Sequence, residues 1–379
     1  MTSARTINYS GSYPLFHERN VPKMSEFVHL HLHTEYSMLD GACRIKEIPA
    51  AAKAAGHSAV AITDHGVMYG AIQFYNACKA EGIKPIIGCE VYLAPRSRFD
   101  KNYGDDSEFT HLVLLCENET GYRNLIKMVS LSFTEGFYIK PRVDIELLQR
   151  YHEGLIALSG CLSGRVARLI AETDMSGAME FAKQLNGIFG DGNFYLEIQD
   201  HGIALQKRVN EGIYNISRQT GIPLVATNDV HYLRKGDADT QTVMMCIQTG
   251  TRLTDEKPVG FETKEFYYKN EREMRELFPN HPEAIENTAK IAERCNLEFV
   301  FGSYILPAYT PDDGSEPTEY LRKMAYEGLA RRVKAGEIVY NTLNTEEAYR
   351  ERIEYELSVV IGMGYAEYYL IVSDFVSFY

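Results

Sequence analysis

Residues 27–34 read FVHLHLHT, a stretch in which histidine alternates with apolar residues. Alternation with a period of two is typical of a half-buried β-strand, because successive side chains of a strand point to opposite faces. His31 and His33 would then lie side by side on one face. Two neutral imidazoles at this spacing can bind a divalent metal ion, although a strand with core histidines would give the same pattern.

Further strand-like segments follow along the chain. Most are separated by helix-like segments, and over roughly 270 residues this alternation favours parallel strands in an α/β barrel. The expected strands are residues 27–34, 58–63, 84–93, 109–116, 155–159, 194–198 and 224–227. The expected helices between them are residues 45–55, 71–81, 119–132, two stretches within 163–189, and 204–220.

Potential metal ligands recur where these strands end. Six of the seven expected strands place a His, Asp, Glu or Cys residue at or near the end, which is where barrels of this kind carry active sites. His111 is the exception, because it lies at the start of its strand. Either that strand runs in the opposite direction or the barrel is distorted. The recurrence favours a metal site over a set of core histidines.

Bulk composition narrows the class of protein. Hydrophobic residues make up 45% and charged residues 24% of the 379-residue chain, as is ordinary for a globular protein. The net charge of −13 argues against non-specific nucleic-acid binding but permits DNA as a substrate at one localised site. The seven scattered cysteines contain no CxxC pair and indicate reduced thiols in a cytosolic protein. No apolar run has the length of a membrane span.

The pattern changes after about residue 240. Helices are expected at 237–248, 271–278 and 283–296, with a short strand-like segment at 265–269. A proline-containing segment follows, and then a charged, helical stretch that ends in an aromatic run. We therefore expect a loose N-terminal extension over residues 1–24, a metal-binding barrel over 25–300, a linker over 301–317 and a separate region over 318–379.

Several short motifs resemble the signature of the PHP (polymerase and histidinol phosphatase) domain. They are His31-x-His33, Thr63-Asp64-His65, Gly88-x-Glu90, the lone His111, Ser159-Gly160-Cys161 and Asp229-x-His231.

Longer runs resemble the N-terminal part of bacterial DNA polymerase III alpha subunits, over residues 27–379. These runs are FVHLHLHTEYSMLDGA, AITDHGVMYGA, LEIQDHG, VATNDVHYL and GMGYAEYYLIVSDFV.

The resemblance implies an α/β fold, a distorted seven-stranded (β/α) barrel of PHP type, followed by the start of a partial, mainly helical palm region. It also implies two to three divalent metal ions, zinc or manganese, since mixed His and Asp ligation and a cysteine suit these metals better than magnesium. One ion would be held by His31, His33, Glu90 and Asp229. A second would share Glu90 and add His111 and Cys161, and a third would use Asp40, His65 and His231.

Other polar residues near these positions have a supporting role or a structural one. Asp64 is expected to orient a ligand, and His29 to be a packed histidine or a second layer behind the ligands. Asp200 and His201 could line the site or cap the helix that follows them. Glu197 lies in the middle of a strand and could contact the rim of the site.

The resemblance also implies a function. The family carries out DNA-directed DNA polymerisation, a nucleotidyl transfer, but the palm carboxylates and their Mg²⁺ ions are expected outside this chain, because residues 318–379 contain no DxD pair. The chemistry expected of the chain itself is metal-dependent phosphoester hydrolysis, as a 3′–5′ exonuclease that proofreads the primer 3′ end. The expected partners are DNA and other replicase subunits, such as a proofreading exonuclease subunit and the sliding clamp, in the cytoplasm.

Three other functions stay open at this point. The same cluster would serve a small-molecule phosphatase of the histidinol-phosphate type, or hydrolysis of pyrophosphate. A non-catalytic role is the third, in which the barrel stabilises the polymerase and receives a separate exonuclease subunit. Intact ligand residues favour catalysis without proving it.

The aromatic residues 365–369 are expected to belong to a hydrophobic interface and not to a base-stacking surface.

Overall fold

The structure is a computed structural model that describes residues 27–38, 40–255, 259–302 and 307–378. The extension expected over residues 1–24 lies outside the described residues. Two compact units are formed by the described chain, one up to Glu298 and the other from Phe299 onward. Each is described separately below, and the finer boundaries expected from the sequence stay predictions.

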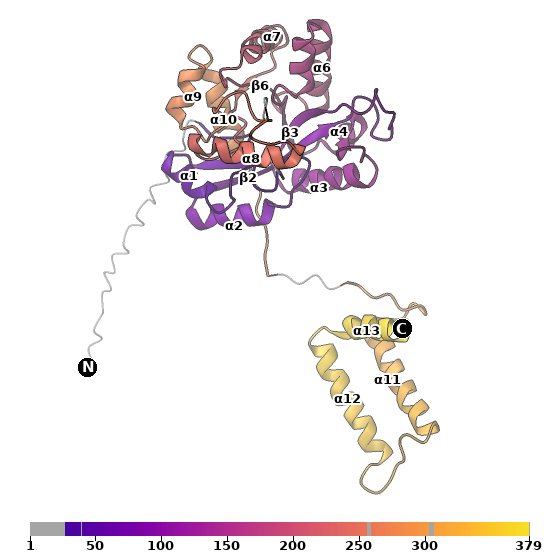
Figure 1. Ribbon diagram of the computed structural model, residues 1–379. Helices are drawn as coiled ribbons and strands as arrows, with labels where there is room; N and C mark the ends of the chain where they lie inside the picture. Colours follow the sequence, from indigo (N-terminus) through magenta and orange to yellow (C-terminus); the bar gives the residue numbers. More distant parts are fainter. Residues whose placement is uncertain (1–26, 39, 256–258, 303–306, 379) are drawn as a thin grey trace, which may run out of the picture. The chain divides into compact units, whose positions relative to one another are not determined.

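The strands of the first unit form one curled sheet surrounded by helices (Figure 1). Its hydrogen-bonded order is β1-β2-β3-β5-β6-β7, with β4 paired to β2 outside this path. The strands are β1 (Ala59–Ile62), β2 (Lys84–Leu93), β3 (Thr110–Cys116), β4 (Arg142–Val143), β5 (Leu155–Leu158), β6 (Phe194–Ile198) and β7 (Leu224–Ala226). The predicted α/β class is confirmed.

Residues 27–34 close this sheet into a barrel. His29 bridges to Val60 of β1, and Leu32 bridges to Val230 just after β7, both in the parallel sense. The stretch therefore forms the seventh strand-like segment of the barrel and lies between β1 and β7. It does so through isolated bridges, so the prediction of one regular strand here is wrong in detail.

Strand β3 runs against its neighbours. It pairs antiparallel with β2 and with β5, whereas the other strand pairs of the sheet are parallel. Reversal brings His111, at the start of β3, opposite Tyr92, near the end of β2. The first alternative predicted for His111, a strand in the opposite direction, is confirmed. An antiparallel neighbour needs no crossover helix, which is why a loop alone joins β2 to β3.

The barrel interior is an apolar core, and the helices cover its outside. Hydrophobic burial of this kind contributes ~25 cal/mol per Å² of apolar surface, which makes the core the main source of stability. Fully buried residues of this core include Val28, Leu30, Ala61, Val113, Leu115, Ile156 and Val225. The helices are α1 (Ile48–Ala54), α2 (Ala71–Glu81), α3 (Glu119–Thr134), α4 (Ile145–Tyr151), α5 (Arg165–Ala171), α6 (Met175–Phe189), α7 (Ala204–Thr220), η1 (Lys235–Asp237), α8 (Ala238–Thr249), α9 (Glu271–Leu277) and α10 (Pro282–Arg294).

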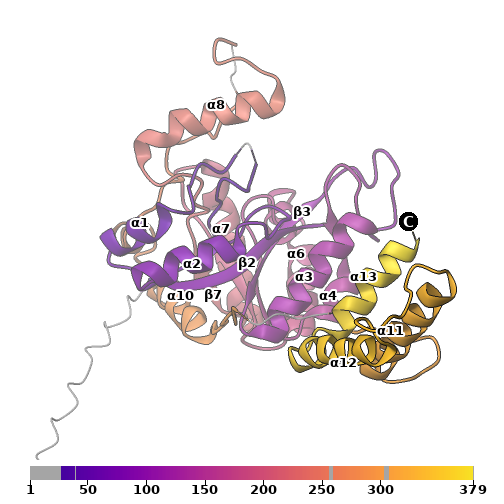
Figure 2. The same ribbon diagram turned by 90° about the horizontal axis from the view of Figure 1, so that it is seen from below.

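The structure contains the predicted helices and strands with small shifts of their ends. The elements that the sequence analysis did not predict are short. The sequence analysis did not predict β4 or α4, which have only two and seven residues. Helix α4 begins after Asp144, whose side chain accepts a hydrogen bond from the amide of Leu147. The strand-like segment 265–269 forms only one bridge, between Tyr267 and Tyr232. Helix α8 stands away from the strands of the sheet, as Figure 2 shows.

The described residues of the second unit form three helices with a small core. The helices are α11 (Pro317–Lys334), α12 (Glu346–Gly362) and α13 (Ala366–Phe378). Only Leu329, Leu357, Ala366 and Leu370 are buried hydrophobic residues in the described part of this unit. In the described chain, no single helix is long and apolar enough to cross a membrane, and α12 and α13 reach that level only when joined across a bend of 110°.

Two helical glycines allow a matched test of packing in the first unit. A Cβ atom added at Gly121, in α3, would overlap the carbonyl oxygen of Gly154, whereas one added at Gly187, in α6, would meet nothing within 4 Å. Gly121→Ala should therefore lower the free energy of unfolding by ~1–3 kcal/mol. Gly187→Ala should raise it by ~0.4–1 kcal/mol, because alanine restricts the unfolded chain. Thermal unfolding followed by circular dichroism checks both, and equal melting temperatures would contradict the assigned packing of α3.

Candidate metal centre

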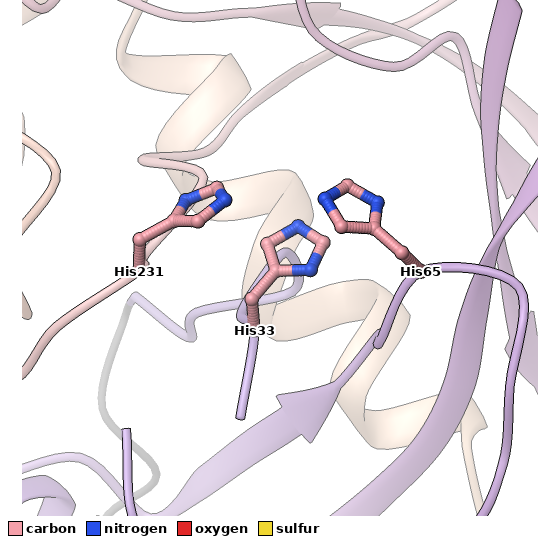
Figure 3. A group of neighbouring side chains, drawn as sticks. All are labelled: His33, His65 and His231. Carbon is pink, nitrogen blue, oxygen red and sulfur yellow. The ribbon is translucent and has the colours of Figure 1, made fainter. Parts of the chain in front are cut away.

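Histidine and carboxylate side chains from five segments meet at one end of the barrel. They come from residues 27–34, from the turn after β1, from β2, from the start of β3 and from the turn after β7. Figure 3 shows His33, His65 and His231 with their rings converging from separate segments. Three groups of potential metal-binding side chains have donor atoms within 4.8 Å of one another. They are His31, His33 and Asp229; His65, Glu90 and His111; and His33, His65 and His231.

The first group has the geometry of a preformed ligand set. The Nε2 atoms of His31 and His33 lie 3.1 Å apart. Both face Asp229 Oδ1, at 3.2 and 3.1 Å. With metal–nitrogen bonds of ~2.0–2.1 Å, the edges of a coordination tetrahedron measure ~3.3 Å, which these separations approach. Glu90 completes the group, with Oε1 3.3 Å from His31 Nε2.

Glu90 faces both sides of the cluster. Its Oε2 lies 2.7 Å from His65 Nδ1, and its Oε1 lies 3.2 Å from His111 Nδ1. The residue is 1% exposed. A carboxylate in this position can bridge two cations, because each of its oxygens faces a different set of imidazoles.

The remaining predicted ligands are placed less uniformly. Asp40 Oδ2 lies 3.1 Å from His65 Nε2, which agrees with the grouping expected for a third ion. His65 also belongs to the Glu90 and His111 group, so it lies between two of the predicted sets. Cys161 is in none of the three groups found among the described residues. The assignment of individual side chains to individual ions stays a prediction.

Buried donor atoms that face one another show that the cluster suits cations. Both oxygens of Glu90, Nδ1 of His65, Nδ1 of His111 and Oδ1 of Asp229 are sealed from solvent, and their polar neighbours are one another and the other ring nitrogens of the cluster. Asp40 Oδ1 is also sealed from solvent, and no hydrogen bond to it is found among the described residues. A buried carboxylate is costly unless positive charge faces it, and a metal ion bound between the carboxylates and the neutral imidazoles supplies that charge. The clusters therefore point to divalent metal binding.

The electrostatics of the centre follow from this concentration of charge. Burial lowers the pKa of His65, but the Glu90 carboxylate and then Asp40 outweigh it and raise the pKa to about 10. Burial likewise opposes protonation of His31, yet Asp229, Glu197 and Glu90 raise its pKa well above the ordinary value. The carboxylates thus draw positive charge to these rings, and a bound cation competes with protons for the same positions.

Glu197 fixes the orientation of His31. Its Oε1 lies 2.7 Å from His31 Nδ1 and both side chains are fully buried. Glu197 is itself held by the amide of Gly160 at 3.0 Å and by the side chains of Gln199 and Thr227. Because Nδ1 donates to the carboxylate, Nε2 of the neutral ring presents its lone pair to the cluster.

A second set of hydrogen bonds, through Ser37 and Asp64, fixes the orientation of the His33 ring. Its Nδ1 lies 2.9 Å from the hydroxyl oxygen of Ser37, and that hydroxyl donates to Asp64 at 2.9 Å. Asp64 also accepts hydrogen bonds from the amide and the hydroxyl of Thr34. Ser37 can therefore only accept from His33, which leaves Nε2 free to bind a cation. Asp64 occupies the supporting position predicted for it, although it acts through Ser37.

The turn after β7 carries Asp229 in a strained conformation. Asp229 has φ of 42°, in the left-handed region that side chains other than glycine rarely adopt. His201 Nε2 lies 3.0 Å from the carbonyl of Asn228, and Gln206 holds the other ring nitrogen of His201. His201 thus supports the turn from behind. Strain retained at a site that the surrounding structure fixes is typical of functional turns.

For two sets of neighbouring residues, one of the predicted alternatives is wrong. Helix α7 begins at Ala204 after Ile203, which makes no side-chain cap, so the capping alternative for Asp200 and His201 does not hold. His29 Nε2 lies 2.7 Å from the carbonyl of Lys269, and its ring contacts Phe27, His57 and Tyr268. The alternative of a packed histidine therefore holds for His29, and the alternative of a layer behind the ligands does not, because the alternation of residues 27–34 is interrupted.

Sequence reasoning missed Ser37 and gave Glu197 too small a role. A glutamate within the buried strand FYLEI is itself a signal, since charged residues are seldom fully buried without a partner. Ser37 gave no such signal, because a serine in a polar loop is unremarkable and only the fold brings it to His33.

Two family models match parts of this chain. Residues 29–201 match the PHP domain, and residues 319–379 match the bacterial DNA polymerase III alpha NTPase domain. A solved two-domain protein from Bacteroides vulgatus, described as containing a predicted PHP-like metal-dependent phosphoesterase, has a TM-score of 0.33. It is 13% identical and covers 71% of this chain and 65% of its own.

Curated relatives named DNA polymerase III subunit alpha align with nearly the whole chain. The relative from Borreliella burgdorferi is 45% identical over 357 residues, and that from Treponema pallidum is 42% identical over 353 residues. Both alignments cover 93% of this chain, which spans only 30% and 29% of those relatives. This chain belongs to the family of bacterial DNA polymerase III alpha subunits and carries their PHP domain.

Proposed function

We propose that the barrel hydrolyses phosphoesters with two to three divalent metal ions, zinc or manganese, and that its substrate is the 3′-terminal phosphodiester of DNA. The observation that carries the proposal is the buried Glu90 carboxylate, whose two oxygens lie within 3.5 Å of ring nitrogens from four imidazoles. Clusters of this composition suit hydrolysis, because bound cations supply positive charge that activates water and neutralises phosphoryl oxygens.

The chain's own residues contribute orientation and charge. Glu197 and Ser37 hold His31 and His33 with Nε2 toward the cluster, so no reorganisation is needed when a cation binds. Glu90 and Asp229 supply negative charge in a setting from which bulk water is largely excluded, where electrostatic interactions are stronger than in solution.

The polymerase context suggests the substrate. We infer that the enzyme to which this chain belongs is a DNA-directed DNA polymerase of the cytoplasm. Its partners would be DNA, a proofreading exonuclease subunit and the sliding clamp. We place the Mg²⁺ chemistry of polymerisation outside this chain. In support, carboxylates of the second unit have structural partners here: Glu354 contacts Arg322 and Tyr326, and Glu367 accepts from the amide of Tyr309.

The first prediction concerns metal content. The purified chain loaded with manganese or zinc should hold about two to three ions, as expected for a cluster with a bridging carboxylate. Glu90→Gln should lose more than one ion, because the amide cannot bridge two cations. Elemental analysis after removal of free metal measures both values. Less than one ion bound to the parent chain would refute the metal centre.

The second prediction concerns Glu197. Glu197→Gln keeps the shape of the side chain but weakens its hold on His31, so metal affinity should fall by ~10–100-fold. Competition with a fluorescent chelator measures the affinity. Glu211→Gln, on the exposed surface of α7, is the matched control and should leave it unchanged. Equal affinities in the two variants would show that Glu197 is merely structural.

The third prediction concerns the reaction. The metal-loaded chain should remove nucleotides from a 3′-labelled single strand, and chelators should stop it. Asp229→Asn and His33→Ala should each lower the rate by roughly 100-fold or more, since each removes a group that faces the reacting centre. Denaturing gel electrophoresis of the products gives the rates.

The control for these variants is His152→Ala, beyond the C-terminus of α4, which should keep the parent rate. Nuclease activity that survives both changes in the centre would mean that a contaminant is responsible. A chain that binds its metals yet cleaves no DNA would point instead to the phosphatase or non-catalytic alternatives, which p-nitrophenyl phosphate hydrolysis separates.

A further inference from the structure

Tyr92 lies directly beside the metal centre. Its ring stacks on His65 with centroids 5.9 Å apart and meets His111 edge-on at 5.3 Å. The residue is 5% exposed. Among the described residues its hydroxyl has no hydrogen-bond partner, and the hydroxyl oxygen is not one of the unsatisfied atoms that are sealed from solvent. Tyr92 therefore contacts two of the predicted metal-binding histidines and can have a role in the site as well as in packing.

Lys140 lies over the Tyr92 ring. Its ammonium nitrogen is 5.3 Å from the ring centroid, and in the described chain no carboxylate lies within 4.0 Å of it. Two arginines of the neighbouring loop are neutralised, Arg96 by Asp106 and Arg98 by Asp144. Lys140 is thus a cation next to the centre that is available to an anion.

The backbone around Lys140 is firmly held. The guanidinium of Arg142 is fully buried and donates to the carbonyls of Gly136 and Asp106, at 3.1 and 2.9 Å. Arg142 also pairs with Tyr92 in the register of β4 on β2. Ile139 has φ of 66°, a conformation that a β-branched residue adopts only when the surroundings impose it. Lys140 is therefore placed by the fold and not by chance.

We propose that Lys140 and Tyr92 form a phosphate-binding subsite beside the metal centre, which takes a non-bridging oxygen of a nucleic-acid phosphodiester. The inference rests on the proposed function and names the residues that recognise its substrate. A carboxylate-rich centre in a chain of net charge −13 repels an anionic strand, so a cation that is not paired with the protein's own carboxylates compensates for this repulsion. The Tyr92 hydroxyl supplies a donor to the same phosphate group.

Binding is the primary test, because it does not require turnover. The probe is a fluorescein-labelled single-stranded oligonucleotide with a free 3′ end, titrated with manganese-loaded 379-residue chain and followed by anisotropy. Lys140→Ala should weaken binding roughly 10-fold or more, the range for a hydrogen bond to a charged group. It should also reduce the slope of log K against log salt by about 0.7, the value for one phosphate contact on a single strand.

Conservative variants separate recognition from folding. Lys140→Arg should keep most of the affinity, and Tyr92→Phe, which keeps the ring packed on His65, should lose only the contribution of the hydroxyl. Lys183→Ala, on the exposed face of α6, makes the same change of net charge and should bind like the parent. Metal content should be equal in all variants, since none removes a predicted ligand.

The outcomes distinguish this subsite from the proposed hydrolysis. If the parent binds the strand and Lys140→Ala does not, the subsite holds even when no cleavage is detected, and only the proposed hydrolysis fails. If cleavage is detected, Lys140→Ala should raise KM while metal content is unchanged. Binding and cleavage by Lys140→Ala that match those of Lys183→Ala would overturn the subsite, as would a parent that does not bind the strand.

Discussion

The buried carboxylate of Glu90 is the constraint on which this structure depends. It lies on β2 with its oxygens within 3.5 Å of ring nitrogens from His31, His33, His65 and His111. Burial of a carboxylate is expensive, so the fold must bring compensating charge to it. A closed barrel meets this requirement, because separate segments of chain end around the same point.

The reversed direction of β3 also helps to bring compensating charge to the Glu90 carboxylate. In a uniformly parallel barrel His111, at the start of its strand, would lie at the opposite end from Glu90. The antiparallel pairing places it beside Tyr92 and therefore beside the carboxylate. The same end of β2 pairs with β4, which brings Lys140 over Tyr92. One irregularity of the sheet thus shapes both the metal centre and the surface next to it.

A layer of hydrogen bonds behind the histidines makes the centre specific. Glu197 and Ser37 each engage one ring nitrogen of a histidine, and this leaves the other nitrogen directed into the cluster. Such contacts cost little when the partners are fixed in a packed core. They connect the ligand geometry to the barrel, since Glu197 lies on β6 and Ser37 is held by Asp64 after β1.

The sequence by itself determined the α/β class and most strand and helix positions, because periodicity is a local property, and the resemblance of its motifs to the PHP domain implied the nine candidate ligands. Tertiary structure decided the rest. The interrupted strand at residues 27–34 separates His29 from His31, and no local pattern reveals that interruption. The contacts of Ser37 with His33 and of Lys140 with Tyr92 depend on how distant segments meet. Side-chain neighbours across a barrel are set by strand direction and register, which periodicity alone does not specify.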